Sequence, residues 1–533
     1  MSSEPSKGAS VGGRATPQFA QTGLNYFQLV AFQLNIRQSV GVHFPATPVS
    51  NVAALWYQTV AKHGAHVQIA LARLPHDPTK TRPMIARQQL DVNGPQTKNV
   101  SFPPPSIRAM EGLSMEELLE RCLYLNLPNT GMPAVILFIE GSTAAKSQDS
   151  PCASLILNFN AALWDTTTTH TVVNAFLYHL ARMHDPESII PPPAEKDPQH
   201  LYCRMQGLMP VMLKKIQELA TDNQGQLPGT QPVSPDQEAP PPTPIDIILP
   251  KPSNTHPQLA ATPYRRVVAQ VDGETVLACE RQIQAFAAAH GGLTSTLISL
   301  RSFATACFLR ALAMEYFEEV APFKKRVTIV QSTQIDPREL IFPKGFHEPY
   351  LHAVGTLSHG LSYNRMGNQG GGERSGDEQG PSTDNRESLV ECLLRESLRV
   401  EQDLQQRLKR GEGLQKTMEL MTGRMDQQST NARVKPVAIE LMDHGVYECL
   451  HPDFEISVGH RMDSCPHMSI AMFRKSPSHQ MTWAAQIGKN QGREATMKWM
   501  ERSRAMWSIV ASAEDLPSVN LEDTNQNAAT VFN

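Results

Sequence analysis

Residues 153–170 read Ala-Ser-Leu-Ile-Leu-Asn-Phe-Asn-Ala-Ala-Leu-Trp-Asp-Thr-Thr-Thr-Thr-His, and the apolar run at 155–159 predicts a buried strand. A polar turn follows, ending in Asp165 and four threonines. Apolar residues then recur at helical spacing over 172–180, and a threonine hydroxyl of the turn is expected to cap that helix. A short turn between a strand and a helix is a common place to hold chemistry, so 153–183 is the first candidate for a site.

This segment resembles the active-site segment of the CoA-dependent acyltransferases, a superfamily that includes condensation domains, alcohol acetyltransferases and natural-product acyltransferases. Their motif is His-His-x-x-x-Asp-Gly at the end of such a strand. Aligned on the aspartate, the motif positions here read Asn160, Ala161, Ala162, Leu163, Trp164, Asp165 and Thr166. The resemblance places the general base of the family at Ala161, which cannot carry a proton. It therefore supports the fold of the family and counts against its usual reaction.

The resemblance implies an α/β (α+β) fold with two chloramphenicol-acetyltransferase-like lobes and a tunnel between them. Two halves of similar make-up, separated by a Pro-rich stretch, agree with it. The expected parts are a disordered N-terminus at 1–23, a first lobe at 24–184, a Pro-rich crossover with one helix at 185–263, a second lobe at 264–512 with a mobile loop at 366–386, and a disordered tail at 513–533.

Local patterns predict several elements within these lobes. Over residues 24–42, apolar and polar side chains alternate enough to predict a strand. Ser114 followed by Glu117 predicts a capping box at the start of a helix. A long charged helix is expected at 387–422, with an interruption at its glycines.

Composition excludes several classes of protein. The 533 residues are 40% hydrophobic and 19% charged, which is typical of a globular protein, and the net charge of -4 gives no case for nucleic acid or an anionic membrane. Eight scattered cysteines favour reduced thiols over a disulfide scaffold. No signal peptide or membrane span is visible in the sequence, so we expect a cytoplasmic protein. We also expect a monomer.

The candidate site residues come from the motif and from the second half. The expected substrate pocket comprises Asn160, Ala161, Trp164, Asp165, Gln334 and His352. The candidates for catalysis are His352 and His359, in a segment that could line the tunnel. The resemblance implies a structural role for Asp165, which holds the motif turn in shape, with Arg338 as its candidate partner.

No metal site is expected. Cys449, His451, His460, Cys465 and His467 invite a zinc interpretation. However, metal ligands usually have two- to four-residue spacers, and pairs one residue apart in a strand share a face for ordinary packing reasons.

Three functions remain open. The first is an enzyme of secondary-metabolite biosynthesis that has lost its histidine and catalyses a cofactor-free cyclisation or rearrangement of a polyketide, peptide or terpenoid intermediate. The second is an O- or N-acyltransferase that uses acyl-CoA as co-substrate and another base. The third is a non-catalytic binding or scaffold protein.

Overall fold

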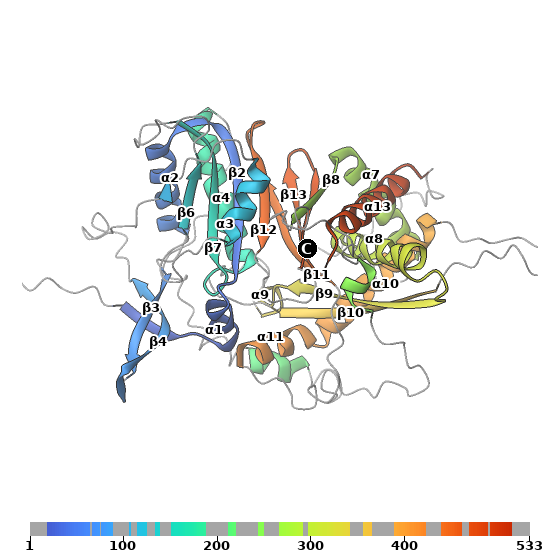
Figure 1. Ribbon diagram of the computed structural model, residues 1–533, viewed down its shortest axis with the longest axis horizontal. Helices are drawn as coiled ribbons and strands as arrows, with labels where there is room; N and C mark the ends of the chain where they lie inside the picture. The colour runs from blue at the N-terminus through green and yellow to red at the C-terminus, as the bar shows by residue number, and fades with distance from the viewer. Residues whose placement is uncertain are drawn as a thin grey trace, which may run out of the picture.

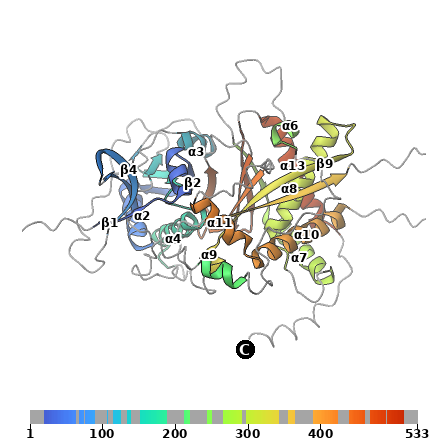
Figure 2. The ribbon, with the colours of Figure 1, turned by 90° about the horizontal axis from the view of Figure 1, so that it is seen from below.

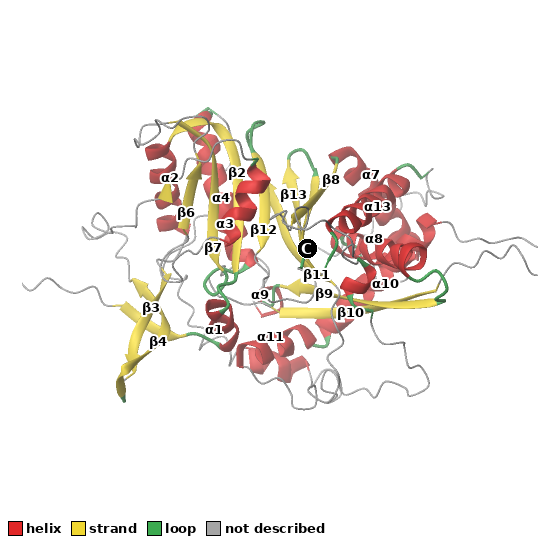
Figure 3. Ribbon diagram, in the orientation of Figure 1, coloured by secondary structure: helices red, strands yellow, loops and turns green. Residues whose placement is uncertain are grey.

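The computed structural model describes residues 19–63, 67–74, 76–88, 106–107, 114–124, 134–138, 151–187, 212–219, 243–249, 266–290, 297–341, 355–364, 389–422, 439–460, 468–488 and 491–513. Two mixed α/β lobes lie side by side (Figure 1). The coloured ribbon in Figure 3 shows that each lobe has a sheet with helices packed against it. Within the described residues, no helix has the length and apolar character needed to span a membrane.

The first lobe is built on a five-stranded sheet of order β12-β2-β7-β6-β5, beside a three-stranded sheet of order β1-β4-β3. Its elements are β1 (Phe19–Gly23), α1 (Tyr26–Gln33), β2 (Arg37–Pro48), α2 (Val49–His63), β3 (Val67–Leu74), β4 (Asp77–Gln88), β5 (Ser106–Ile107), α3 (Met115–Tyr124), β6 (Ala134–Phe138), β7 (Pro151–Asn160) and α4 (Thr166–His184).

The second lobe is built on a six-stranded sheet of order β10-β9-β11-β13-β14-β8. The elements from there to the C-terminus are α6 (Ile245–Ile248), β8 (Arg266–Val271), α7 (Gly273–His290), α8 (Leu300–Glu315), the π-helix η3 (Tyr316–Val320), β9 (Arg326–Ile335), α9 (Arg338–Ile341), β10 (Gly355–Asn364), α10 (Leu389–Lys409), α11 (Glu412–Thr422), β11 (Ile439–Glu448), β12 (Glu455–His460), β13 (Met468–Ser476), β14 (Met481–Gln486) and α13 (Arg493–Ala511).

One strand crosses between the halves of the sequence. β12 comes from the second half but pairs antiparallel with β2 at the edge of the first sheet (Figure 1). The strands before and after it in the sequence, β11 and β13, belong to the second sheet. The crossing therefore ties the two lobes together.

The second sheet is buried on both faces. Along β13, Ile470 and Met472 pack with the helices of the second lobe, whereas Ala471 and Phe473 belong to the apolar cluster of the first lobe. Alternate strand residues point to opposite faces, so one face meets α7, α8 and α13 and the other meets the first lobe. Figure 2 shows these helices around the second lobe, with α4 of the first lobe on the opposite side.

Several predicted elements are confirmed and one is wrong. The capping box exists, because the amide of Ser114 donates to Glu117 and the amide of Glu117 donates to the Ser114 hydroxyl. The long helix breaks at Gly411, which has a positive φ of 79°. The strand predicted at 24–42 begins only at Arg37. Helix α1 precedes it because Asn25 and Gln28 form a reciprocal cap.

Candidate functional site

The motif turn, residues 160–165, is held in one shape by side chains around it. The Asn160 side chain accepts a hydrogen bond from the amide of Ala162 at 2.9 Å. The Asp165 side chain accepts from the amide of Thr168 at 2.8 Å and is the N-cap of α4. The expectation of a threonine cap was therefore wrong. A carboxylate placed there satisfies a free amide and also faces the positive end of the helix dipole.

Gln38 of β2 fixes the turn from the neighbouring strand. Its amide donates to the carbonyl of Trp164 at 2.7 Å and also contacts the Thr169 hydroxyl. The turn is therefore anchored to the first sheet as well as to its own helix. Asn160, Trp164 and Asp165 are buried, and Ala161 is half-buried.

The start of α4 meets the second lobe directly. The Thr166 hydroxyl donates to Gln334 at 3.3 Å, and the Thr167 hydroxyl donates to Asp336 at 2.8 Å. Gln334 in turn donates to Glu440 of β11 at 3.2 Å. We call this region, where α4 meets β9, β11 and β12, the lobe junction. It places Gln334 at the start of α4, directly after the motif turn.

His359 faces away from the lobe junction. It lies directly opposite Gln331 in the β9–β10 pair, so these two side chains share a face. On that face Gln331 donates to Thr305 of α8, and the Nδ1 atom of His359 lies 2.7 Å from Asp403 of α10. Gln334, three residues further along β9, points to the opposite face. His352 and the side chain of Arg338 lie outside the described residues.

A row of polar residues crosses the second sheet at one register. Each strand contributes one residue, and all face the first lobe: Ser358, Ser332, Glu440, Ser469, Gln486 and Arg266. The Ser469 hydroxyl is buried and has no hydrogen-bond partner in the part of the chain that the structure describes. We call this set the polar row. Buried hydroxyls are normally satisfied, so an unsatisfied one in such a row suits a ligand.

Two buried histidines meet at the lobe junction. The Nε2 atoms of His444 on β11 and His460 on β12 are 2.7 Å apart. The Tyr447 hydroxyl lies 3.4 Å from Nδ1 of His444. Burial lowers the pKa of His460 to about 4, although the carboxylate of Glu440 raises it. Burial and the neighbouring His460 hold the pKa of His444 well below its usual range. Both rings are therefore neutral at pH 7.

No three His, Cys, Asp or Glu side chains are grouped to hold a metal ion within the described ranges. Cys465 and His467 of the considered zinc set lie outside those ranges.

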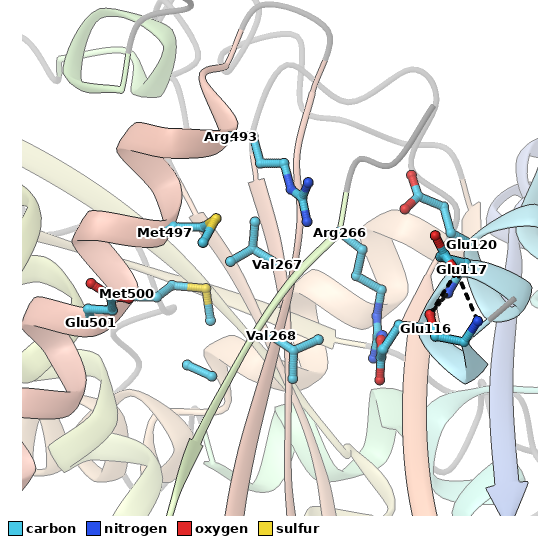
Figure 4. A pocket seen from close by; sticks show the side chains of 12 residues that line it. Glu116, Glu117, Glu120, Arg266, Val267, Val268, Arg493, Met497, Met500 and Glu501 are labelled. Carbon is cyan, nitrogen blue, oxygen red and sulfur yellow. Dashed lines mark hydrogen bonds and ion pairs between the residues drawn. The ribbon is translucent and has the colours of Figure 1, made fainter. Parts of the chain in front are cut away.

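A cavity of about 440 Å³ opens between α3 and α13, with β8 running between them (Figure 4). Its lining includes Glu116, Glu120, Arg266, Arg493, Met497 and Met500. Arg266 forms an ion pair with Glu116 and donates from Nε to the carbonyl of Val458 at 3.1 Å. Of the predicted pocket residues that the structure describes, none lines this cavity.

Arg266 belongs both to the cavity and to the polar row. The row runs from Arg266 through four strand spacings to Ser332, roughly 19 Å at about 4.8 Å per strand. The row therefore extends from Arg266 at the wall of the cavity to Glu440, which contacts Gln334 at the lobe junction.

Most residues of this site could not be identified from local sequence patterns. The polar row takes one residue from each strand, so no stretch of sequence contains it. Glu440 and His444 carried no local signal. His460 was considered only as a metal ligand. Its partner His444 is brought to it by the crossing of β12 into the first sheet, and the spacing of residues along the sequence does not reveal this contact.

No protein-family model and no curated protein sequence matches the chain. Solved structures do match over nearly its full length. The epimerization domain of the third module of tyrocidine synthetase B is 11% identical, with a TM-score of 0.52 over 93% of this chain and 96% of that one. Trichothecene 15-O-acetyltransferase from Fusarium sporotrichioides is 10% identical, with a TM-score of 0.52 over 92% and 95%.

The condensation domain of the monacolin K polyketide synthase is 10% identical, with a TM-score of 0.52 over 92% of this chain and 97% of that one. The predicted fold class is thus confirmed. The chain has the two-lobed α/β fold that condensation domains share with acetyltransferases.

Proposed function

We propose that this chain, which has the fold of condensation domains and acetyltransferases, binds an intermediate of natural-product biosynthesis between its lobes and catalyses its cyclisation or rearrangement without a cofactor. Support comes from solved structures of the same fold, whose names describe a trichothecene acetyltransferase and a polyketide-synthase condensation domain.

The observation that carries the proposal is the motif turn. Its shape is maintained by the Asp165 cap and by Gln38, yet position 161, where the resemblance places the base, carries a methyl group. A general base must come within about 3 Å of the group that it deprotonates, and a methyl group cannot act as one. The retained turn therefore fits a role in shaping a binding site. Orientation of a flexible molecule can supply much of the acceleration of an intramolecular reaction.

One observation favours acyl transfer as the second candidate. A neutral imidazole, His460, lies on the strand next to Gln38, which holds the turn. An imidazole there could deprotonate an alcohol or amine in place of the missing histidine. The fold and the lobe junction are common to both reactions, so the choice needs an experiment.

The test uses purified protein in two parallel assays. In the first, a panel of acyl-CoAs and biosynthetic alcohols or amines is followed for release of free CoA. In the second, unacylated polyketide, peptide and terpenoid intermediates are incubated with protein alone and analysed for an isomer of equal mass. We expect the isomer and no CoA release. CoA release at ordinary enzymatic rates would establish the acyltransferase instead. No product in either assay, together with measurable binding of an intermediate, would indicate a binding protein.

Matched variants locate the reaction. Gln334→Ala removes a side chain that contacts the start of α4, whereas His359→Ala changes a histidine on the other face of the sheet. Isomer formation should fall in the first variant and persist in the second. The reverse result would place the chemistry away from the lobe junction.

A further inference from the structure

We propose that His460 is the acid–base residue of the lobe junction, which takes a proton from one atom of the bound molecule and returns it to another, and that His444 and Tyr447 position its ring. This inference rests on the proposed function and names the group that moves the proton. His460, on the strand β12 that crosses between the lobes, thus provides the proton-accepting group that Ala161 cannot provide.

The placement of His460 follows from strand register. His460 lies directly opposite Gln38 in the β2–β12 pair, so the two side chains share a face, with Cβ atoms about 4.5–5.5 Å apart. Gln38 on that face contacts the Trp164 carbonyl and the Thr169 hydroxyl. The imidazole therefore lies one strand away from the motif turn, on the side that faces α4.

The hydrogen bonds of the pair leave one nitrogen open. Two Nε2 atoms 2.7 Å apart must share a single proton, since two lone pairs or two N–H groups would repel each other. When His460 donates, His444 accepts at Nε2 and carries its own proton at Nδ1, which faces the Tyr447 oxygen. Nδ1 of His460 then carries a lone pair and has no hydrogen-bond partner among the described residues.

The charged groups around the pair support this role. Glu440 of β11 acts on His460 and would stabilise its protonated form, whereas Arg266 of β8 opposes it. His170 of α4 and His460 both act against protonation of His444. The resting His460 is thus neutral and able to accept a proton, and Glu440 is the group that offsets the charge formed in the reaction.

The reaction balances without a co-reactant. A C–H or O–H bond of the bound molecule breaks, and its proton binds Nδ1 of His460 while the electron pair stays on the molecule. Bond reorganisation then moves that electron pair, and the imidazolium returns the proton to a second atom. The product has the same mass as the substrate, and the histidine is restored.

A probe that needs no knowledge of the natural substrate tests this directly. The probe is 5-nitrobenzisoxazole, a small planar molecule with one acidic C–H bond. A base removes its ring C–H proton, the electron pair forms a nitrile, and the N–O bond breaks, so that the ring opens to a single coloured cyanonitrophenolate. The imidazolium then releases its proton to water. We expect saturable turnover that rises with pH around pH 4 and is level from about pH 6 upward.

Four variants assign the effect. His460→Gln should reduce turnover about 10²-fold, the lower end for loss of a general base. His444→Gln, whose amide can still accept the hydrogen bond, should stay within about threefold of the unchanged protein, whereas His444→Leu should resemble His460→Gln. His76→Gln, at an exposed turn between β3 and β4, should change nothing. Thermal unfolding of each variant confirms that it is folded.

Equal turnover in His460→Gln and the unchanged protein would overturn the inference, as would an inflection near pH 6.5 that persists in His460→Gln. The proposed function fails separately, through absence of an isomer in the intermediate assay. A base that acts on the probe in a protein without isomerase activity would be consistent with acyl transfer. Isomerase activity that persists in His460→Gln would support the proposed cyclisation or rearrangement and would refute the assignment of His460 as the base.

Discussion

Asp165 owes its position to the hydrogen bond at the start of α4, where it accepts from the amide of Thr168. The resemblance suggested an ion pair with Arg338, and the cap offers a second account of why an aspartate stands here. The two accounts differ in what they predict for an uncharged isostere.

We expect Asp165→Ala to lower the free energy of unfolding by about 1 kcal/mol and Asp165→Asn to change it by a few tenths, because asparagine caps helices as well as aspartate does. Chemical denaturation measures both values. A loss of about 3–5 kcal/mol in Asp165→Asn would instead reveal a buried ion pair.

The histidine pair predicts a pH dependence of stability. The folded-state pKa of His460 is about 4, below the ordinary value near 6.5, so the unfolded chain binds this proton more readily. The contribution is complete above pH 6.5 and is lost as pH falls toward 4, at about 1.4 kcal/mol per pH unit for one histidine. Denaturation between pH 7 and 4.5 should show a shallower slope in His460→Gln than in His76→Gln. Parallel slopes would mean that His460 titrates normally.

Among the elements, β12 depends on a close approach by α3. A Cβ atom built on Gly459 would lie 2.7 Å from Leu119 and 3.0 Å from Leu123, both fully buried in α3. Gly459 in β12 and Gly41 in β2 thus let α3 lie against the sheet, which brings Glu116 within reach of Arg266.

Gly459→Ala should therefore destabilise the protein by about 1–3 kcal/mol through overpacking. Gly360→Ala is the matched control, because its Cβ would meet only Val330 at 3.6 Å in an ordinary strand. It should be neutral or stabilising by up to about 1 kcal/mol, since alanine is less costly than glycine inside a strand. Unfolding midpoints that move equally in both variants would contradict this packing.

In the whole molecule, the lobes are joined by an ion pair as well as by the crossing strand. Arg266 of β8 is buried and pairs with Glu116 of α3, whose side chain is 43% exposed. Removing one member of such a pair leaves the buried charge uncompensated, whereas replacing the buried charge by an apolar group of similar size is often neutral.

We expect Glu116→Gln to cost about 3 kcal/mol, the lower end of the range for buried pairs because Glu116 is partly exposed, and Arg266→Met to cost much less. Differential scanning calorimetry of the two variants measures the order. Greater loss in Arg266→Met would show that the bonds of Arg266 to the Val458 carbonyl, and not its charge, hold the lobes.

Local patterns were enough to predict most of the elements. The strand at 155–159, the helix after Asp165 and the capping box at Ser114 follow from hydrophobic periodicity and capping chemistry, which act over a few residues. The fold class came from the resemblance of one segment, and the solved structures confirm it. The same local reasoning misassigned residues 26–33, because apolar spacings of two and three residues fit a strand and a helix alike.

The contents of the lobe junction could not be obtained in this way. The polar row needs the register of six strands, and the His444–His460 pair needs β12 to leave its own half of the chain and join the first sheet. Register and strand order are set by how whole faces pack against one another, over separations of hundreds of residues, so the amino-acid pattern around any one of these side chains carries no trace of its partners.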